Sequence, residues 1–310
     1  MTDPSNPVTI VGAGMAGAAC AAALKSRDVP VRIVDRGRAP GGRMASPTLR
    51  DRRVDTGAGY FTVRDDGFTD LVERWSRAGI AREWTDTFGV LSPDSDPDTK
   101  TGPMRWGTPA GLRSLVRAVL DDARVEVESV AVDELPGGDV VIAMPDPQAS
   151  RLLTVPDAVD YDPVITVVCG FAERTWPFED AAFVNDHPDI EFVADDGARR
   201  GDGSAVLVTH TTADRARRHL DNPDGALDPV VAALRDVAHT GEPLWTHVHR
   251  WTYAKPAGKH DAFFGSIGDQ GRIVGLAGDQ WCPNGSPRIE SAWKSGTELG
   301  YSIAAERLRR

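Results

Sequence analysis

The stretch Val8-Thr-Ile-Val-Gly-Ala-Gly-Met-Ala-Gly17, followed by the strand-like Val31-Arg-Ile-Val-Asp35, decides the fold of this chain. Its order of apolar run, glycine turn, alanine-rich helix and second apolar run predicts a strand-turn-helix-strand unit. Gly12 permits the tight turn, Gly14 lets the backbone approach a pyrophosphate, and Gly17 lets the helix pack closely on the strand. The helix N-terminus offers free N–H groups to phosphate. Because Asp35 stands where an acid binds ribose hydroxyls, the unit is predicted to bind a dinucleotide.

Three further passages indicate which dinucleotide is bound, and they favour a flavin over a nicotinamide. Gly41-Gly-Arg-Met44 follows the second strand closely. An arginine after a glycine pair can donate two hydrogen bonds from its guanidinium to the pyrophosphate. Asp55-Thr-Gly-Ala-Gly-Tyr-Phe61 is rich in glycine, which would let its backbone pack against a flat ring such as that of a flavin. Gly278-Asp279 precedes Ile289-Glu290. Asp279 is the acid placed to bind a ribityl chain, and the helix that begins near Ile289 is expected to direct its N-terminus at the flavin N1 and C2 carbonyl.

Composition argues against several classes of protein. The 310 residues include 35 basic and 46 acidic side chains, and the net charge of −11 argues against nucleic acid or an anionic membrane as partner. The longest apolar run is shorter than the roughly 20 residues that span a bilayer, and no signal peptide is recognised. Three widely spaced cysteines fit a reducing compartment, the cytoplasm. Cysteine and histidine do not cluster at metal-ligand spacing, so no metal site is expected.

The order of elements predicts an α/β fold made of two interleaved domains. A Rossmann-like FAD-binding domain, as in GR2-type flavoproteins, is assigned residues 1–66, 105–150 and 268–310. An α+β substrate domain with a mixed or antiparallel sheet is assigned residues 67–104 and 151–267. The part that binds the flavin therefore takes both ends of the chain.

Local patterns predict the main elements of both domains. A helix is expected over Asp70–Trp84, a mobile surface loop over Ser92–Gly102 and a capped helix over Thr108–Leu120. The remaining expected elements are strands at 125–132, 139–143, 164–171 and 204–210, a helix at 229–237, a strand at 272–279 and a helix from 288 onward.

Taken together, these motifs resemble the FAD-dependent amine oxidase superfamily, and within it the sequence looks most like the bacterial renalases. Besides the glycine motifs, the resemblance rests on Asp55–Thr62, Arg105–Pro109, Ala143–Ala149, Phe183–Asp186 and His249–Ala254. These passages cover nearly the whole chain in the expected order. Two regions depart from the family: 125–139 is short, with Pro136-Gly-Gly138 in place of a hairpin, and 280–287 contains less glycine.

The resemblance implies a noncovalently bound FAD and an oxidase reaction. Renalases oxidise the 2- and 6-dihydro isomers of NAD(P)H to NAD(P)+, transfer the hydride to the flavin and pass the electrons to O2, which gives H2O2. Hydride transfer needs orientation more than acid–base help, so no catalytic triad is expected. The residues expected to contact FAD are Gly12, Gly14, Met15, Ala16, Gly17, Asp35, Arg36, Gly42, Arg43, Gly59, Tyr60, Val130, Gly278, Asp279, Ile289 and Glu290.

The candidate walls of the substrate site are mostly aromatic. Tyr60, Trp251 and Trp281 are expected to sandwich a dihydropyridine ring beside the flavin, although Trp251 suits a core position equally well. His247 and His249 alternate on an expected strand and therefore share a face. His249 is the candidate to hydrogen-bond a carboxamide, against the commoner structural role of a strand histidine.

Two other functions stay open on the sequence alone. Amine oxidases and other small-molecule dehydrogenases or desaturases share this scaffold and often carry a lysine, linked through water to flavin N5, for which Lys255 and Lys259 are available. The chain is alternatively a catalytically idle FAD-binding module. Cys282 raises the question of a thioether to the flavin, which the resemblance argues against.

Overall fold

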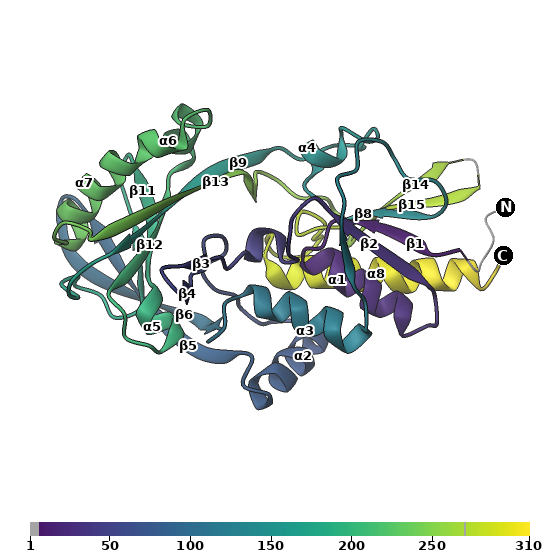
Figure 1. Ribbon diagram of the computed structural model, residues 1–310, viewed down its shortest axis with the longest axis horizontal. Coiled ribbons are helices and arrows are strands. Elements are labelled where there is room, and N and C mark those ends of the chain that lie inside the picture. The colour runs from purple at the N-terminus through teal and green to yellow at the C-terminus, as the bar shows by residue number, and fades with distance from the viewer. Residues whose placement is uncertain (1–5, 270) are drawn as a thin grey trace.

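The computed structural model describes residues 6–269 and 271–310, which form two large sheets and the helices around them (Figure 1). The first sheet has six strands in the order β14-β15-β8-β1-β2-β7. All neighbours are parallel except β14, which pairs antiparallel with β15 at the edge. The strands are β1 (Val8–Val11), β2 (Val31–Asp35), β7 (Val127–Ser129), β8 (Val140–Ile142), β14 (Gly265–Asp269) and β15 (Arg272–Leu276). The Rossmann-like α/β fold predicted from the glycine turn is confirmed.

Two helices pack tightly beside this sheet because small residues line their contact. α1 (Met15–Lys25) is buried along most of its length and packs against α8 (Ile289–Arg307). A Cβ at Gly296 would lie 2.0 Å from the carbonyl oxygen of Ala16, and one at Gly300 would lie 2.7 Å from that of Cys20. Larger side chains would push the helices apart, so these two glycines set how closely the C-terminal helix approaches the glycine turn.

The second sheet has seven strands in the order β13-β9-β12-β11-β10-β5-β6. Neighbours are antiparallel except β10 and β5, which are parallel, so the sheet is mixed as predicted. The strands are β5 (Arg82–Ser92), β6 (Ser95–Gly107), β9 (Tyr161–Gly170), β10 (Ala181–Val184), β11 (Ile190–Asp195), β12 (Val206–Thr211) and β13 (Trp245–Pro256).

Helices and a small two-stranded sheet complete the fold. The remaining elements are η1 (Gly42–Met44), β3 (Thr48–Leu49), β4 (Arg52–Arg53), α2 (Asp66–Arg77), α3 (Arg113–Ala123), α4 (Asp146–Ala149), α5 (Asp196–Arg200), α6 (Ala213–Arg218), η2 (Pro223–Ala226) and α7 (Leu227–Ala238). β3 and β4 form a small hairpin that lies between the two sheets (Figure 1).

The seven-stranded sheet has two different faces because side chains alternate along each strand. On one face, Ile165, Val167 and Leu207 pack with Val230 and Leu234 of α7. We call this the outer face, since α6 and α7 cover it on the side away from the six-stranded sheet (Figure 1). The opposite face, here called the inner face, carries a row of directly paired residues: His249, Thr166, His210 and Phe192.

The structure corrects two of the local expectations. Residues 92–102 are not a loop but belong to the β5–β6 hairpin, in which Ser92 lies opposite Ser95. Because β6 is an edge strand and largely exposed, its polar sequence lacks the alternation that marks a strand. The helix expected over 70–84 is α2, which begins after the capping carboxylate of Asp65 and ends before Gly79, whose φ is +70°.

Several other boundaries shift by a few residues. The helix expected from Thr108 is α3 and begins only at Arg113, and the strand expected over 125–132 is β7. β14 begins at Gly265, before the expected domain boundary at 268, and β6 ends at Gly107, after the one at 105.

All three cysteines are buried and carry free thiols. Within the residues that the structure describes, no helix is both long enough and apolar enough to cross a membrane.

Candidate functional site

The first glycine turn has a tight side and an open side. A Cβ at Gly12, whose φ is +112°, would lie 2.3 Å from the carbonyl oxygen of Ala143, and one at Gly17 would lie 1.9 Å from that of Gly12. At Gly14, by contrast, a Cβ would have no described atom within 4 Å. Two glycines are thus required for packing, while the third exposes backbone at the N-terminus of α1, where a phosphate would bind.

Asp35 lies at the carboxyl end of β2 with its carboxylate turned toward this turn. Its Oδ2 accepts a hydrogen bond from the Ala13 amide at 2.7 Å, and its Oδ1 accepts one from the Gly37 amide at 2.6 Å. The Val130 amide donates to the Asp35 carbonyl at 2.8 Å, and the Val130 side chain is 41% exposed. An apolar side chain beside the acid predicted to bind ribose suits the adenine end of a dinucleotide. Arg36 is exposed next to it.

The second glycine turn lies directly against the first. Gly41 and Gly42 have φ values of +134° and +53°, which only glycine adopts easily. The Gly41 amide donates to the Ala13 carbonyl at 2.8 Å, and a Cβ at Gly42 would lie 3.4 Å from the Cα of Gly14. The backbone thus brings Arg43 beside the site of the predicted pyrophosphate.

Arg43 and Asp279, far apart in the sequence, form a two-pronged ion pair. The Arg43 Nη1 and Nη2 donate to the two Asp279 carboxylate oxygens at 2.9 and 2.6 Å, and Nη1 also donates to the Ala254 carbonyl at 3.1 Å. From the sequence, the Arg43 guanidinium is expected to bind a pyrophosphate. In the structure it pairs with Asp279, the acid that follows β15. The Arg43 guanidinium also lies 5.5 Å from the ring centre of Tyr161, whose pKa is raised by burial and by the nearby Asp279.

Residues 56–59, which we call the Thr56–Gly59 passage, run between Arg43 and the inner face. On one side the Ala58 amide donates to the Arg43 carbonyl at 2.9 Å. On the other side, a Cβ at Gly59 would lie 2.9 Å from the ring of Phe192. A Cβ at Gly57 would lie 1.9 Å from the Arg43 carbonyl oxygen, so neither glycine leaves room for a side chain.

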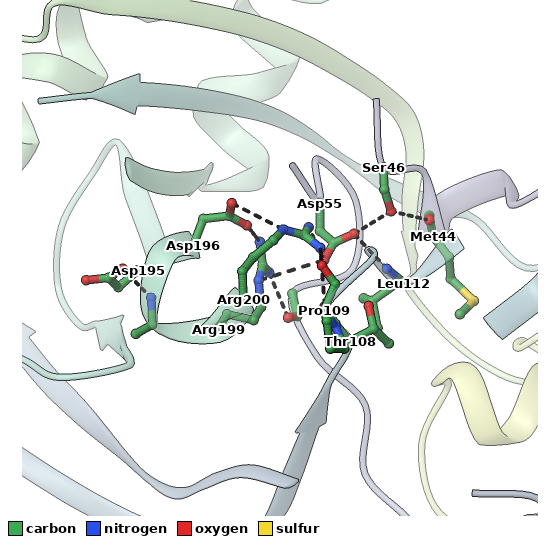
Figure 2. A network of polar contacts seen from close by, with 12 residues as sticks. Met44, Ser46, Asp55, Thr108, Pro109, Leu112, Asp195, Asp196, Arg199 and Arg200 are labelled. Carbon is green, nitrogen blue, oxygen red and sulfur yellow. Dashed lines mark hydrogen bonds and ion pairs between the residues drawn. The ribbon is translucent and has the colours of Figure 1, made fainter. Parts of the chain in front are cut away.

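A buried network of charges anchors the start of this passage to α5 (Figure 2). Asp55 Oδ2 lies 2.8 Å from Arg200 Nη2, and Asp55 Oδ1 accepts hydrogen bonds from the Ser46 hydroxyl and, at 2.9 Å, from the Leu112 amide. Arg199 and Asp196 pair with each other, and both side chains are fully buried. Since a buried charge must be paired, this network holds the passage and the seven-stranded sheet in one arrangement.

The inner face opposite the passage is built from histidines and aromatic rings. His249 and Trp251 of β13 lie with their ring centres 4.4 Å apart, and His210 of β12 lies 5.4 Å from Phe192. Burial lowers the pKa of His210 to about 3, with help from Lys255 and Arg199. Burial also lowers the pKa of His249 and that of His247. The three histidines of this face are therefore uncharged at neutral pH.

The expected aromatic sandwich is not formed by the three rings named from the sequence. Tyr60 packs edge-on against Phe88 at 5.2 Å between ring centres. Trp281 stacks on His260 at 3.7 Å and is only 7% exposed, in a core cluster with Val274 and Leu276. His260 in turn lies 2.7 Å from Asp146. Trp281 thus belongs to the core of the six-stranded sheet, while His249 and Trp251 share the inner face.

The remaining predicted cofactor residues lie in α1, after β15 and at the start of α8. Met15 and Ala16 are buried in the first turn of α1, and the Gly278 amide donates to the Ser295 hydroxyl at 3.1 Å. Ile289 begins α8. The Glu290 Oε1 accepts hydrogen bonds from the amides of residues 64 and 65, both at 2.6 Å, so this carboxylate fixes the segment before α2.

Sequence reasoning missed three residues that contact the Thr56–Gly59 passage or its surroundings. Thr166 Oγ1 donates to the Thr56 carbonyl at 2.7 Å, and Arg199 Nη1 donates to the Gly59 carbonyl at 2.7 Å. His210 lies beside Gly57. Alternation with Val206 and Val208 places His210 on one face of its strand, but only the strand order brings that face to the passage.

A shallow cavity of about 340 Å³ continues the inner face toward β5, β10 and β11. It is lined by Val90, Lys100, Phe183, Val184, Asn185 and Glu191.

The comparisons with known proteins agree with this architecture. The family model of an NAD(P)-binding Rossmann-like domain matches residues 10–75. A protein of Exiguobacterium sp. 255-15 assigned as a protoporphyrinogen oxidase is similar over 97% of this chain and 99% of its own, with TM-score 0.75 and 14% identity. Cyclohexylamine oxidase from Brevibacterium oxydans IH-35A covers 99% of this chain and 100% of its own, with TM-score 0.74 and 15% identity. Putrescine oxidase covers 96% and 99%, with TM-score 0.72 and 13% identity. The likeness establishes a shared fold.

Proposed function

We propose that this chain is a flavin-dependent oxidoreductase that binds FAD without a covalent bond. The observation that carries the proposal is the convergence of both glycine turns, Asp35 and the Arg43–Asp279 pair at the carboxyl ends of β1, β2 and β15. Ligands of open α/β sheets bind at that edge. The solved structures that share the fold include oxidases, which agrees with this reading.

The residues fit the parts of the cofactor in order. The open Gly14 and the N-terminus of α1 suit the pyrophosphate, while Asp35 and the exposed Val130 suit the adenosine. Arg43 and Asp279 suit the polar chain between the pyrophosphate and the ring. When bound, FAD supplies an acceptor for two electrons and a proton, a chemistry that no side chain of the protein offers.

We propose a dihydropyridine dinucleotide, a 2- or 6-dihydro isomer of NAD(P)H, as substrate. The balanced reaction is dihydro-NAD(P) plus O2 plus one proton to NAD(P)+ plus H2O2. The inner face supports this choice because its histidines are uncharged and the charged groups acting on His210 are the cations Lys255 and Arg199, which suits a neutral ring better than an ammonium ion. His249 and Trp251 would orient the ring and its carboxamide and exclude water from it.

Anaerobic mixing of the purified yellow protein with 2- or 6-dihydro-NAD tests the proposal. We expect the visible absorbance of the flavin to bleach within seconds and to return when O2 is admitted, with formation of H2O2. A yellow protein that neither isomer bleaches would refute the substrate assignment. If a panel of amines fails as well, the chain is a catalytically idle flavin-binding module.

An amine oxidase is the second candidate, since putrescine oxidase and cyclohexylamine oxidase share the fold. For an amine oxidase we expect a lysine side chain directed at the flavin. Lys255 instead pairs with Glu191, and the Nζ of Lys259 donates to the Pro283 carbonyl at 2.8 Å. Bleaching by a primary amine, together with no bleaching by either dihydro-NAD isomer, would favour this candidate.

Noncovalent attachment agrees with the state of Cys282. The side chain is buried, and burial raises the pKa of its thiol, whereas a thioether forms most readily from a reactive thiolate. Acid denaturation should therefore release all yellow colour into the supernatant. Colour that stays with the precipitated chain would contradict noncovalent binding.

A further inference from the structure

The carbonyl groups of the Thr56–Gly59 passage are held by side chains of the seven-stranded sheet and α5. The Thr56 carbonyl accepts two hydrogen bonds, from Trp251 Nε1 and from Thr166 Oγ1, both at 2.7 Å. The Gly59 carbonyl accepts one from Arg199 Nη1 at 2.7 Å. Both carbonyls therefore point toward the seven-stranded sheet and α5.

This fixes the direction of the amides that follow. The described backbone has no cis peptide bond, and in a trans peptide the N–H points opposite to the preceding C=O. The N–H groups of Gly57 and Tyr60 must then point away from the sheet, toward the side on which Arg43 and Asp279 lie. The Ala58 amide, which donates to the Arg43 carbonyl at 2.9 Å, marks that side.

These two amides have nothing to bind in the part of the chain that the structure describes. The Thr56 and Ala58 amides donate to the carbonyls of Ala45 and Arg43, at 3.2 and 2.9 Å, whereas no acceptor is found there for the amides of Gly57 and Tyr60. Gly57 is buried. A buried amide without an acceptor is unfavourable, which favours an acceptor from a ligand at Gly57, while the amide of the half-buried Tyr60 points to the same side.

We propose that Trp251, Thr166 and Arg199 are positioning residues that aim the amides of Gly57 and Tyr60 at the polar edge of the bound flavin ring. This inference rests on the proposed FAD site. The isoalloxazine offers carbonyl and ring-nitrogen acceptors, and these become more electron-rich on reduction. Fixed amide donors would bind the reduced ring more strongly than the oxidised ring and so raise the reduction potential.

A pair of double variants separates this role from simple packing. Trp251→Phe with Thr166→Val removes both donors to the Thr56 carbonyl, and a control with the same two substitutions elsewhere accounts for the lost volume. The control is Trp245→Phe with Thr209→Val: Trp245 lies on the same strand and face as Trp251, whereas Thr209 lies on the outer face, and its buried hydroxyl has no partner within the described chain. The readouts are FAD affinity of the full-length protein, flavin reduction potential, and hydrogen–deuterium exchange at single amides with and without FAD.

In the wild type, FAD should slow exchange at the amides of Gly57 and Tyr60. In the Trp251→Phe, Thr166→Val variant, we expect about fivefold weaker FAD binding, a more negative potential, and loss of protection at Gly57 with protection kept at Tyr60. The control variant should behave as the wild type. Arg199→Lys, if it folds, should give the reciprocal pattern, with protection lost at Tyr60.

Protection at Gly57 that persists in the first double variant, or is lost equally in the control, would overturn the inference. So would wild-type protein that binds FAD without slowing exchange at either amide. A wild type that binds no FAD at all gives a different result, because it refutes the proposed cofactor itself and with it the role of these side chains.

Discussion

The two faces of the seven-stranded sheet use the same strands for different purposes. On β9, Ile165 and Val167 point outward into an aliphatic cluster with α7, while Thr166 between them points inward and bonds the Thr56 carbonyl. On β12, Leu207 lies in the outer cluster and His210 on the inner face. The outer face packs an aliphatic cluster against α7, whereas the inner face adds hydrogen bonds to the Thr56–Gly59 passage to apolar contacts of its own, such as those of Val168 and Val208 with Val54. Adjacent residues of one strand thus pack against α7 and contact the Thr56–Gly59 passage separately.

Breaking the charge network behind the inner face should have the largest effect. Arg199→Ala removes a fully buried guanidinium and leaves Asp196 and Asp55 with less compensation. We expect the free energy of unfolding to fall by about 4 kcal/mol, because an uncompensated buried charge remains. Chemical denaturation monitored by tryptophan fluorescence measures this. A loss below about 1 kcal/mol would mean that water reaches the network and that the passage is not anchored there.

Opening a cavity in the outer face should destabilise the chain and leave the site intact. Leu234→Ala on α7 removes a fully buried side chain from the outer cluster. The expected loss is about 3 kcal/mol of unfolding free energy, from lost burial and an unfilled cavity. FAD affinity, measured at a temperature where the variant is folded, should equal that of the wild type. A tenfold change in affinity would contradict the separation of the two faces.

The inner face should also limit stability in acid through His210. Its pKa is about 3 in the folded protein, below its ordinary value of 6.5, so between these pH values the unfolded chain binds a proton that the folded chain does not. This favours unfolding increasingly as pH falls below 6.5, by about 2 kcal/mol at pH 5. His210→Gln removes the titration, so stability measured at pH 5 and pH 7.5 should differ less in the variant. An equal pH dependence in both proteins would show that His210 is protonated freely in the folded state.

The contrast between the two parts of the molecule also explains how much the sequence reveals. The glycine turn is predictable residue by residue because each glycine has a local geometric cause, visible at Gly12 and Gly17 as contacts that exclude a side chain. The inner face is not predictable in this way, since Thr166 and His210 become neighbours only through the strand order. Trp281 was misplaced for a related reason: its position after Gly278-Asp279 is visible in the sequence, whereas its stacking on His260 depends on how the loop before β14 folds back.

Titration of the apoprotein with FAD tests the central claim most directly, in the wild type and in two matched variants. Gly14→Ala and Gly241→Ala each add one methyl group where a Cβ would meet no described atom within 4 Å, but only Gly14 borders the proposed pyrophosphate. We predict one FAD per chain in the wild type, binding weakened about tenfold or more by Gly14→Ala and unchanged by Gly241→Ala, with equal thermal stability of all three apoproteins. A wild type that binds no FAD, or a Gly14→Ala variant that binds it as tightly as the wild type, would contradict the account.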